Sequence, residues 1–155
     1  MSGSPAEPGT GPSSGSATGR DAELTDAELT GRDAELTDAE LTGALTELRA
    51  HCLVLPEATE RLSHGEPTWF VRKVFVSFAG RHHDDRVACW CAATAEERDA
   101  LVAEDPDRFF VPPYVGGRGW LGVYLDVPGV DWVGLREIVR EAYRLVAPKR
   151  LTALL

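Results

Sequence analysis

The chain has 155 residues, of which 43% are hydrophobic and 26% are charged, and its net charge is -9. No stretch approaches the roughly 20 apolar residues that cross a bilayer, and the chain lacks the basic start and apolar run of a secretory signal. Three cysteines without a regular spacing do not form a disulfide framework. We therefore expect a cytoplasmic protein, outside the membrane, with one folded domain.

The N-terminal part has the composition of a disordered arm. Residues 1–18 are rich in Gly, Ser and Pro, and the unit GRDAELTDAELT then occurs twice over residues 19–42. The spacing of its leucines, Leu24, Leu29, Leu36 and Leu41, places them on no common face of a helix or strand. Because residues 1–42 hold two arginines against nine carboxylates, we predict an acidic disordered arm there and a folded domain over 43–155.

The first half of the domain reads as one helix followed by three strands. Leu45, Leu48 and Cys52 predict a short helix that ends before Pro56. After the turn signal HGEP, residues 68–71 and 73–78 are rich in β-branched and aromatic side chains, as strands are. The polar stretch GRHHDD is expected to be a loop, and residues 86–92 a third strand.

The second half reads as helix, one or two strands, and helix. Thr94 and Glu97 form a capping box for a helix that ends at Pro106. Prolines exclude a central strand after residues 109–111, which could pair only at an edge, whereas residues 119–127 predict a strand. Asp131 caps a final helix whose apolar stripe consists of Leu135, Ile138, Val139, Ala142 and Val146. This order predicts an α+β two-layer sandwich, an antiparallel sheet with helices packed on one face.

Three ordered segments resemble the MmcQ/YjbR family of small bacterial proteins, over roughly residues 50–151. They begin LPEATERLSHGEPTWF, DPDRFFVPPYVGGRGW and VDWVGLREIVREAY. The motifs are Gly65-x-Pro67-Thr68, Pro113-Tyr114-x-Gly116, Gly119-Trp120 and Ala142-Tyr143. The resemblance implies the order α-β-β-β-α-β-β-α and a DNA-binding function, and it brings no agreed catalytic residues. We expect neither enzymatic activity nor a cofactor, since the chain has no nucleophile elbow, metalloprotease helix or Walker loop.

Cys89 and Cys91 next to His82 and His83 raise the possibility of a zinc site. On a strand the two thiols point to the same face, and structural zinc sites usually use wider cysteine pairs. Small hydrophobic core residues are therefore the preferred interpretation, with a metal site as the alternative. Trp69, Trp90, Trp120 and Trp132 are also expected in the core rather than as stacking platforms for bases.

Local clusters of cations are the best candidates for a binding surface. The candidate DNA-binding residues are Arg72, Lys73, Arg81, Arg86, Arg118, Lys149 and Arg150. Arginine and lysine that contact phosphates supply most of the non-specific affinity for DNA. Arg136, Arg140 and Arg144 share one helix face, but Glu137 and Glu141 are placed to pair with them, which favours an ordinary solvated face.

A protein-interaction module with an acidic flexible tail is the alternative function. Residues 43–155 hold 14 Lys and Arg against 16 Asp and Glu, so the domain is nearly neutral and lacks the strong positive charge of most nucleic-acid-binding domains. The sheet face or the irregular FFVPPY segment would then contact the protein partner. If the domain does bind DNA, the acidic arm could compete with DNA for the basic clusters.

Overall fold

The computed structural model describes residues 38–80, 85–113, 115 and 118–155. Within them the chain forms one antiparallel sheet of six strands, in the spatial order β2-β3-β4-β5-β7-β6. The strands are β2 (Thr59–Ser63), β3 (Glu66–Val71), β4 (Lys73–Gly80), β5 (Val87–Cys91), β6 (Phe109–Phe110) and β7 (Leu121–Tyr124). The helices are α3 (Asp38–Leu53), α4 (Ala95–Glu104), α5 (Trp132–Val146) and α6 (Lys149–Thr152).

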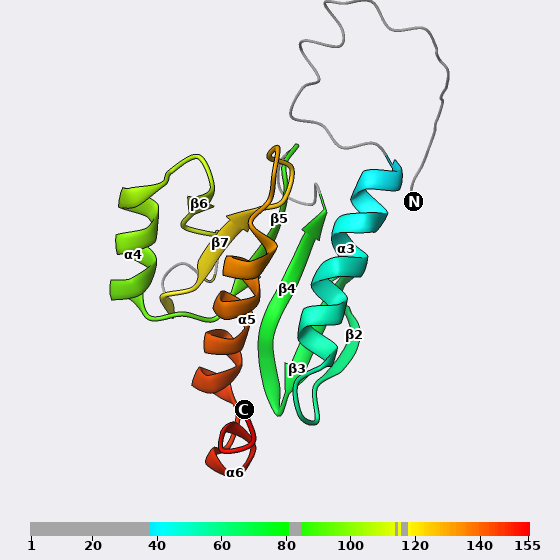
Figure 1. The fold of residues 1–155 in the computed structure, drawn as a ribbon, viewed down its shortest axis with the longest axis vertical. Helices are drawn as coiled ribbons and strands as arrows, with labels where there is room; N and C mark the ends of the chain where they lie inside the picture. Colours follow the sequence, from blue (N-terminus) through cyan, green and yellow to red (C-terminus); the bar gives the residue numbers. More distant parts are fainter. Residues whose placement is uncertain (1–37, 81–84, 114, 116–117) are drawn as a thin grey trace, which may run out of the picture. The chain divides into compact units, whose positions relative to one another are not determined.

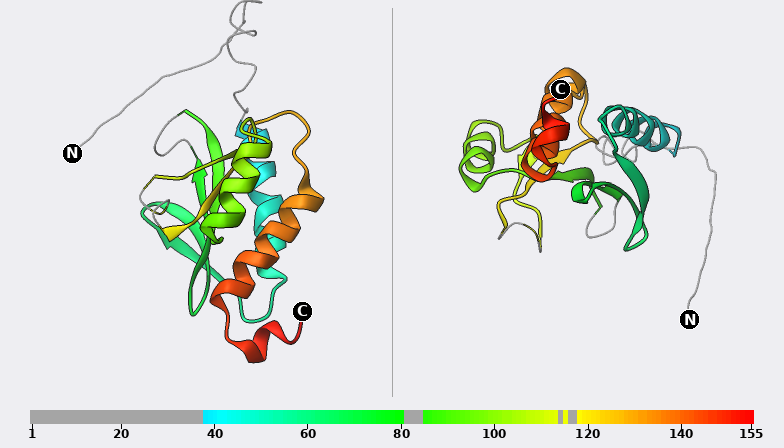
Figure 2. Two further views of the ribbon diagram at one scale, coloured as in Figure 1. Left: turned by 90° about the vertical axis from the view of Figure 1, so that its left-hand side faces the viewer. Right: turned by 90° about the horizontal axis from the view of Figure 1, so that it is seen from below.

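Helices α3 and α5 lie on the same side of the sheet, and Figure 1 and Figure 2 show this arrangement from three directions. The predicted α+β fold and its order of elements are thereby confirmed. We call this side of the sheet the covered face and the opposite side the uncovered face. Among the described helices, none has the length and apolar character that a bilayer span requires.

Strand β2 is the one strand beyond those expected from the sequence. Its residues, TERLS, are mostly exposed, so they carry no apolar alternation that would predict a strand. The strand forms because its backbone pairs with β3, from Thr59 opposite Phe70 to Ser63 opposite Glu66. His64 and Gly65 in the connecting turn both have positive φ, +54° and +81°, as tight hairpin turns require.

Helix α3 begins at Asp38, inside the last copy of DAELT, and so crosses the expected boundary between residues 42 and 43. Leu41 and Leu45 pack against the core, and Leu48 and Cys52 are buried in it. These four positions follow the helical spacing i, i+4, i+7 and i+11. The last leucine of the repeat therefore continues the stripe of the following helix. Residues 1–37, which include most of the expected acidic arm, lie outside the described residues.

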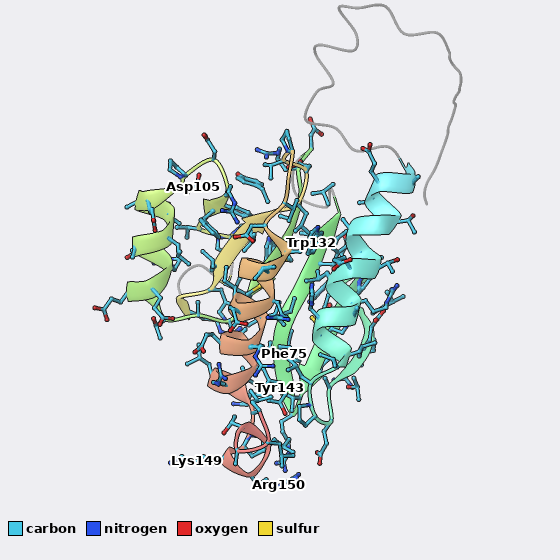
Figure 3. All side chains as sticks on the ribbon, viewed as in Figure 1. Phe75, Asp105, Trp132, Tyr143, Lys149 and Arg150 are labelled. Carbon is cyan, nitrogen blue, oxygen red and sulfur yellow. The ribbon has the colours of Figure 1, made fainter. Side chains whose placement is uncertain are left out.

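The core lies between the covered face and the two helices. The ring of Phe75 on β4 meets the ring of Tyr143 on α5 edge to face, with centroids 5.6 Å apart, and Figure 3 labels both residues. The Tyr143 hydroxyl donates a hydrogen bond to the carbonyl of Pro56 at 2.7 Å, which ties α5 to the loop before β2. Burial raises the pKa of this hydroxyl, as expected for a phenol in an apolar setting.

A charged pair and an indole join α3 to the edge of the sheet. Arg49 of α3 donates two hydrogen bonds to the Glu60 carboxylate of β2, at 2.7 and 2.9 Å. The Nε1–H of Trp69, which is fully buried on β3, donates to the same carboxylate at 3.0 Å. These hydrogen bonds, the one from Arg49 above all, hold the pKa of Glu60 below its usual value. The network fixes the position of α3 over β2 and β3.

Candidate nucleic-acid interface

Two segments far apart in the sequence bring cations to one end of the domain. Arg72 forms the tight turn between β3 and β4, with a φ of +72°, and Lys73 is the first residue of β4. Lys149 and Arg150 begin α6, directly after Pro148 ends the extended link from α5. Figure 1 shows the turn and α6 at the same end of the domain, and Figure 3 labels Lys149 and Arg150 there. We call these four residues the basic end.

Glu57 is the carboxylate that links the two segments of the basic end. The Arg150 guanidinium donates two hydrogen bonds to it, at 3.1 and 3.2 Å. The pKa of Glu57 is lowered first by this hydrogen bond from Arg150, and the charges of Arg150 and Arg72 add to the effect. Arg72 therefore lies close enough to Glu57 to interact with it electrostatically. The basic end thus combines four cations with one carboxylate of opposite charge.

Arg86 is held by a structural partner at the other end of the sheet. It donates two hydrogen bonds to the Asp126 carboxylate, at 2.9 and 2.8 Å, and its guanidinium lies 3.7 Å from the centre of the Tyr124 ring. The backbone N–H of Val87 donates to the same carboxylate, and Asp126 is almost fully buried. Because β5 begins beside the last residue of β4, Arg86 is separated from Lys73 by the length of that strand.

The remaining predicted cations are placed differently. Arg118 is exposed and lines a pocket on the uncovered face. Arg81 lies outside the described residues. The structure therefore brings together four of the seven predicted residues and sets Arg86 and Arg118 apart from them.

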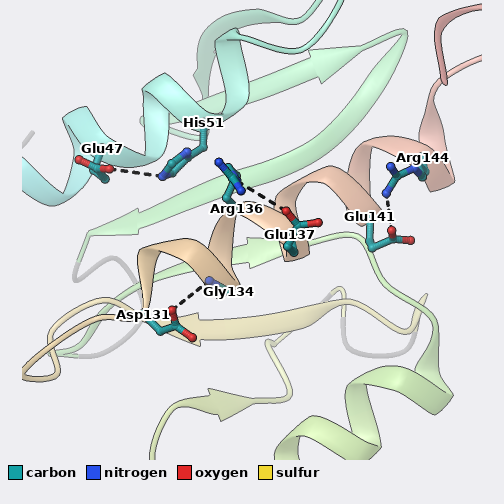
Figure 4. A network of polar contacts seen from close by, with 8 residues as sticks. All are labelled: Glu47, His51, Asp131, Gly134, Arg136, Glu137, Glu141 and Arg144. Atoms are coloured by element: carbon teal, nitrogen blue, oxygen red, sulfur yellow. Dashed lines mark hydrogen bonds and ion pairs between the residues drawn. The ribbon is translucent and has the colours of Figure 1, made fainter. Parts of the chain in front are cut away.

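Two arginines of the α5 row pair with carboxylates of their own helix, as Figure 4 shows. Arg136 lies 3.6 Å from Glu137, and Arg144 pairs with Glu141. Asp131 caps the same helix by accepting a hydrogen bond from the Gly134 N–H at 3.0 Å. This arrangement matches the solvated face that the sequence favours. The row combines three arginines with two glutamates, Glu137 and Glu141, whereas the basic end combines four cations with Glu57 alone, so the basic end is better suited to phosphate contact.

The uncovered face carries a pocket of about 430 Å³. Thr68, Ser77 and Trp90 lie next to one another on β3, β4 and β5 and form one row across it. Phe70, Val74 and Trp120 add apolar walls, while His64 and Arg118 belong to its polar lining. A volume in this range with few polar groups is typical of ligand sites.

Aromatic side chains close the uncovered face at β6 and β7, so the pocket does not extend over that end of the sheet. The Phe110 ring of β6 lies over Gly122 of β7, where a side chain on residue 122 would collide with it. Phe110 also stacks on Tyr124, with ring centroids 4.4 Å apart. The β6–β7 end of this face is therefore closed by packing.

Trp90 packs against the core as predicted, but from the uncovered face, where it also lines the pocket. It is only partly buried and lines the pocket, whereas Trp69 and Trp120 are buried as predicted and Trp132 packs partly exposed beside the core. The alternation of side chains along a strand predicts which face Trp90 occupies. Because Cys89 and Cys91 face the core, the residue between them must face the other side.

The three thiols are packing residues in this structure. Cys52, Cys89 and Cys91 are fully buried and unpaired, and the sulfurs of Cys89 and Cys91 are 3.8 Å apart. Burial raises the pKa of Cys52, and the hydrogen bond with Cys91 raises that of Cys89. A thiol held protonated is a poor metal ligand and a poor nucleophile. His82 and His83, the other residues of the zinc alternative, lie outside the described residues.

Comparison with known proteins identifies the family. The model of the YjbR family matches residues 53–145, which is more than half of the chain. The chain belongs to the YjbR family. This confirms the resemblance drawn from the sequence motifs.

The fold itself has a solved counterpart. The crystal structure of a Deinococcus radiodurans protein with a DUF419 domain is similar, with a TM-score of 0.55 and 19% sequence identity. The similarity covers 71% of this chain and 83% of that chain. At this identity the likeness concerns the fold alone. Among proteins with curated descriptions, none matches this chain.

Proposed function

We propose that this YjbR-family protein is a cytoplasmic, non-enzymatic DNA-binding protein that contacts phosphates weakly through its basic end. One observation carries the proposal: the fold gathers Arg72, Lys73, Lys149 and Arg150 at one end of a nearly neutral domain. Cations clustered in this way attract a polyanion even where the total charge does not. The DNA-binding function implied by the family resemblance is in keeping with it.

The chemistry of the basic end predicts non-specific binding. Lysine and arginine on a turn and on the short helix α6 can reach phosphate oxygens, but α6 has only four residues and is too short to read base edges in a groove. Glu57 opposes the polyanion and occupies part of the hydrogen-bonding capacity of Arg150. Both features predict modest affinity with strong salt dependence.

Charge reversal tests the proposal with a matched control. The double variant Lys73→Glu/Lys149→Glu should weaken binding of a fluorescein-labelled duplex by on the order of tenfold at low salt, because it removes phosphate contacts. The control Arg136→Glu/Arg140→Glu changes the net charge equally on the arginine row of α5 and should alter affinity by about twofold or less. Equal losses in both variants would mean that only total charge matters, and the basic end would then not be the binding surface.

A protein partner is the second candidate, and a groove between α4 and α5 favours it. The groove measures about 360 Å³, with Leu101, Leu121 and Ile138 among its apolar lining and Glu97, Glu137 and Glu141 among its polar lining. An apolar groove with acidic residues suits a cationic amphipathic segment. A Lys-rich amphipathic peptide should bind the full chain and lose affinity with Ile138→Asp. Unchanged peptide binding in that variant would exclude the groove.

A further inference from the structure

The pocket on the uncovered face exists because small side chains occupy the middle of the sheet. Thr68, Ser77 and Ala79 are short pocket-lining residues. Phe70 follows Thr68 on the same face of β3, and Trp90 lies opposite Ser77. On the covered face the same strands carry Trp69 and Val76, which are fully buried. The pocket therefore exists on the uncovered face alone, and aromatic rings from two different strands flank it.

The aromatic walls and polar groups of the pocket suit a ligand that has both a ring and a charge. The Arg61 guanidinium lies 4.0 Å from the centre of the Phe70 ring, and exposed Arg118 lines the pocket. Thr68 Oγ1 donates to the carbonyl of Glu66 at 3.0 Å, and Glu66 accepts a hydrogen bond from the Gly80 N–H at 3.1 Å. Aromatic walls with arginine and a few fixed hydrogen-bonding groups are the features that bind unstacked bases.

The pocket also adjoins the basic end. Its lining residue Val74 directly follows Lys73, and its lining residue Phe70 is separated from Arg72 by Val71 alone. Lys73 pairs with Val71 and so faces the covered side, and a nucleic acid strand in contact with it would reach the pocket by passing around the β3–β4 turn. Phosphate contact and base contact are within reach of the same strand.

We propose that this pocket binds one unpaired nucleobase against Trp90 and Phe70, with Arg118 and Arg61 near the flanking phosphates. The inference rests on the proposed function and adds the class of nucleic acid: a base can enter the pocket from a single strand, whereas a duplex keeps its bases stacked and paired. The protein then binds single strands more tightly than duplexes of the same length. A base with an exocyclic amine has an acceptor in the Glu66 carboxylate.

The test compares labelled single-stranded oligo-deoxycytidine with a labelled duplex of equal length by fluorescence anisotropy, using the full chain. Trp90→Leu should weaken single-strand binding about tenfold, because stacking on one aromatic side chain contributes on the order of 1–3 kcal/mol, and should leave duplex binding unchanged. The matched control Trp132→Leu removes a partly exposed indole beside the helices and should change neither affinity. Ser77→Leu, which fills the hollow from below, should reproduce the effect of Trp90→Leu.

The outcomes separate this inference from the proposed function. Single-strand affinity that stays unchanged in both Trp90→Leu and Ser77→Leu, while Lys73→Glu/Lys149→Glu still weakens duplex binding, overturns the nucleobase pocket and leaves the basic end standing. Wild-type protein that binds neither probe at low salt overturns both. Circular dichroism of each variant identifies loss of fold, and the second pocket variant provides the test if the first one unfolds.

Discussion

The two faces of the sheet are built from the same strands but differ in how their side chains are packed. On the covered face, Trp69, Val76 and Cys91 form a row of fully buried side chains under α3 and α5. On the uncovered face the neighbouring row is Thr68, Ser77 and Trp90, where a hydroxyl floor meets a partly exposed indole. Substitutions on the covered face should therefore change stability, whereas those on the uncovered face should change binding.

The largest expected effect comes from paired tryptophan substitutions on the two faces. Trp69→Ala should lower the free energy of unfolding by about 3–5 kcal/mol, since it opens a cavity in the core and removes a hydrogen bond to Glu60. Trp90→Ala, on the partly exposed side, should cost about half as much or less. Urea denaturation followed by circular dichroism measures both. Equal losses would show that the uncovered face is packed as tightly as the core.

A second comparison concerns two glycines with positive φ. Gly119 has a φ of +91°, and a Cβ there would lie 2.9 Å from the backbone nitrogen of Ala95. Gly65 has a φ of +81° with open space around it. Gly119→Ala should therefore cost about 2–3 kcal/mol, and Gly65→Ala about 1 kcal/mol from backbone strain alone. Similar thermal melting temperatures for the two variants would contradict this ranking.

A smaller effect is expected from the ion pair between α3 and β2. Glu60→Gln keeps an acceptor for Trp69 but removes the charge, and it should cost about 1 kcal/mol at neutral pH, because Arg49 is partly exposed to solvent. The pKa of Glu60 is lower in the folded chain, so the contribution of the pair is complete above the unfolded value of about 4.3. It is lost as the pH falls through the folded pKa. The difference in stability between wild type and variant should shrink in the same acid range, and a difference that is constant down to pH 3 would refute the assignment.

The smallest change in stability is expected at Glu57, together with an increase in DNA affinity. Glu57→Gln removes the carboxylate from the basic end and releases Arg150 for phosphate contact. Melting temperature should stay nearly constant because both partners are exposed, while duplex affinity should rise at low salt. Weaker DNA binding in this variant would indicate that Glu57 orients Arg150 for contact rather than competing for it.

Much of the fold could be predicted from the sequence, because its strands and helices carry clear periodic patterns. Asp131 and Thr94 cap the helices that they were expected to cap, and the stripe of α5 faces the core. Strand β2 is not predictable from its residues, because an edge strand stabilised by backbone pairing has no apolar pattern. The start of α3 depends on Leu41, which joins the stripe of Leu45, Leu48 and Cys52, and the spacing of leucines within the repeat alone does not show this.

The candidate site was less predictable, because it depends on which segments meet. The sequence identifies Arg72, Lys73, Lys149 and Arg150 as exposed cations, but only the fold places the β3–β4 turn beside α6. The sequence likewise cannot show that the guanidinium of Arg86 is hydrogen-bonded to the Asp126 carboxylate. Strand alternation does predict which face Trp90 occupies, because Cys89 and Cys91 on either side of it face the core.

The most direct test of the central claim is the salt dependence of duplex affinity for the full chain. Each phosphate neutralised by a lysine or arginine contributes about -0.9 to the slope of log K against log salt concentration, so three to four contacts at the basic end predict a slope of about -3. The double variant Lys73→Glu/Lys149→Glu should bring that slope close to -1. Absence of binding even at low salt, or a wild-type slope near zero, would contradict phosphate recognition by this domain.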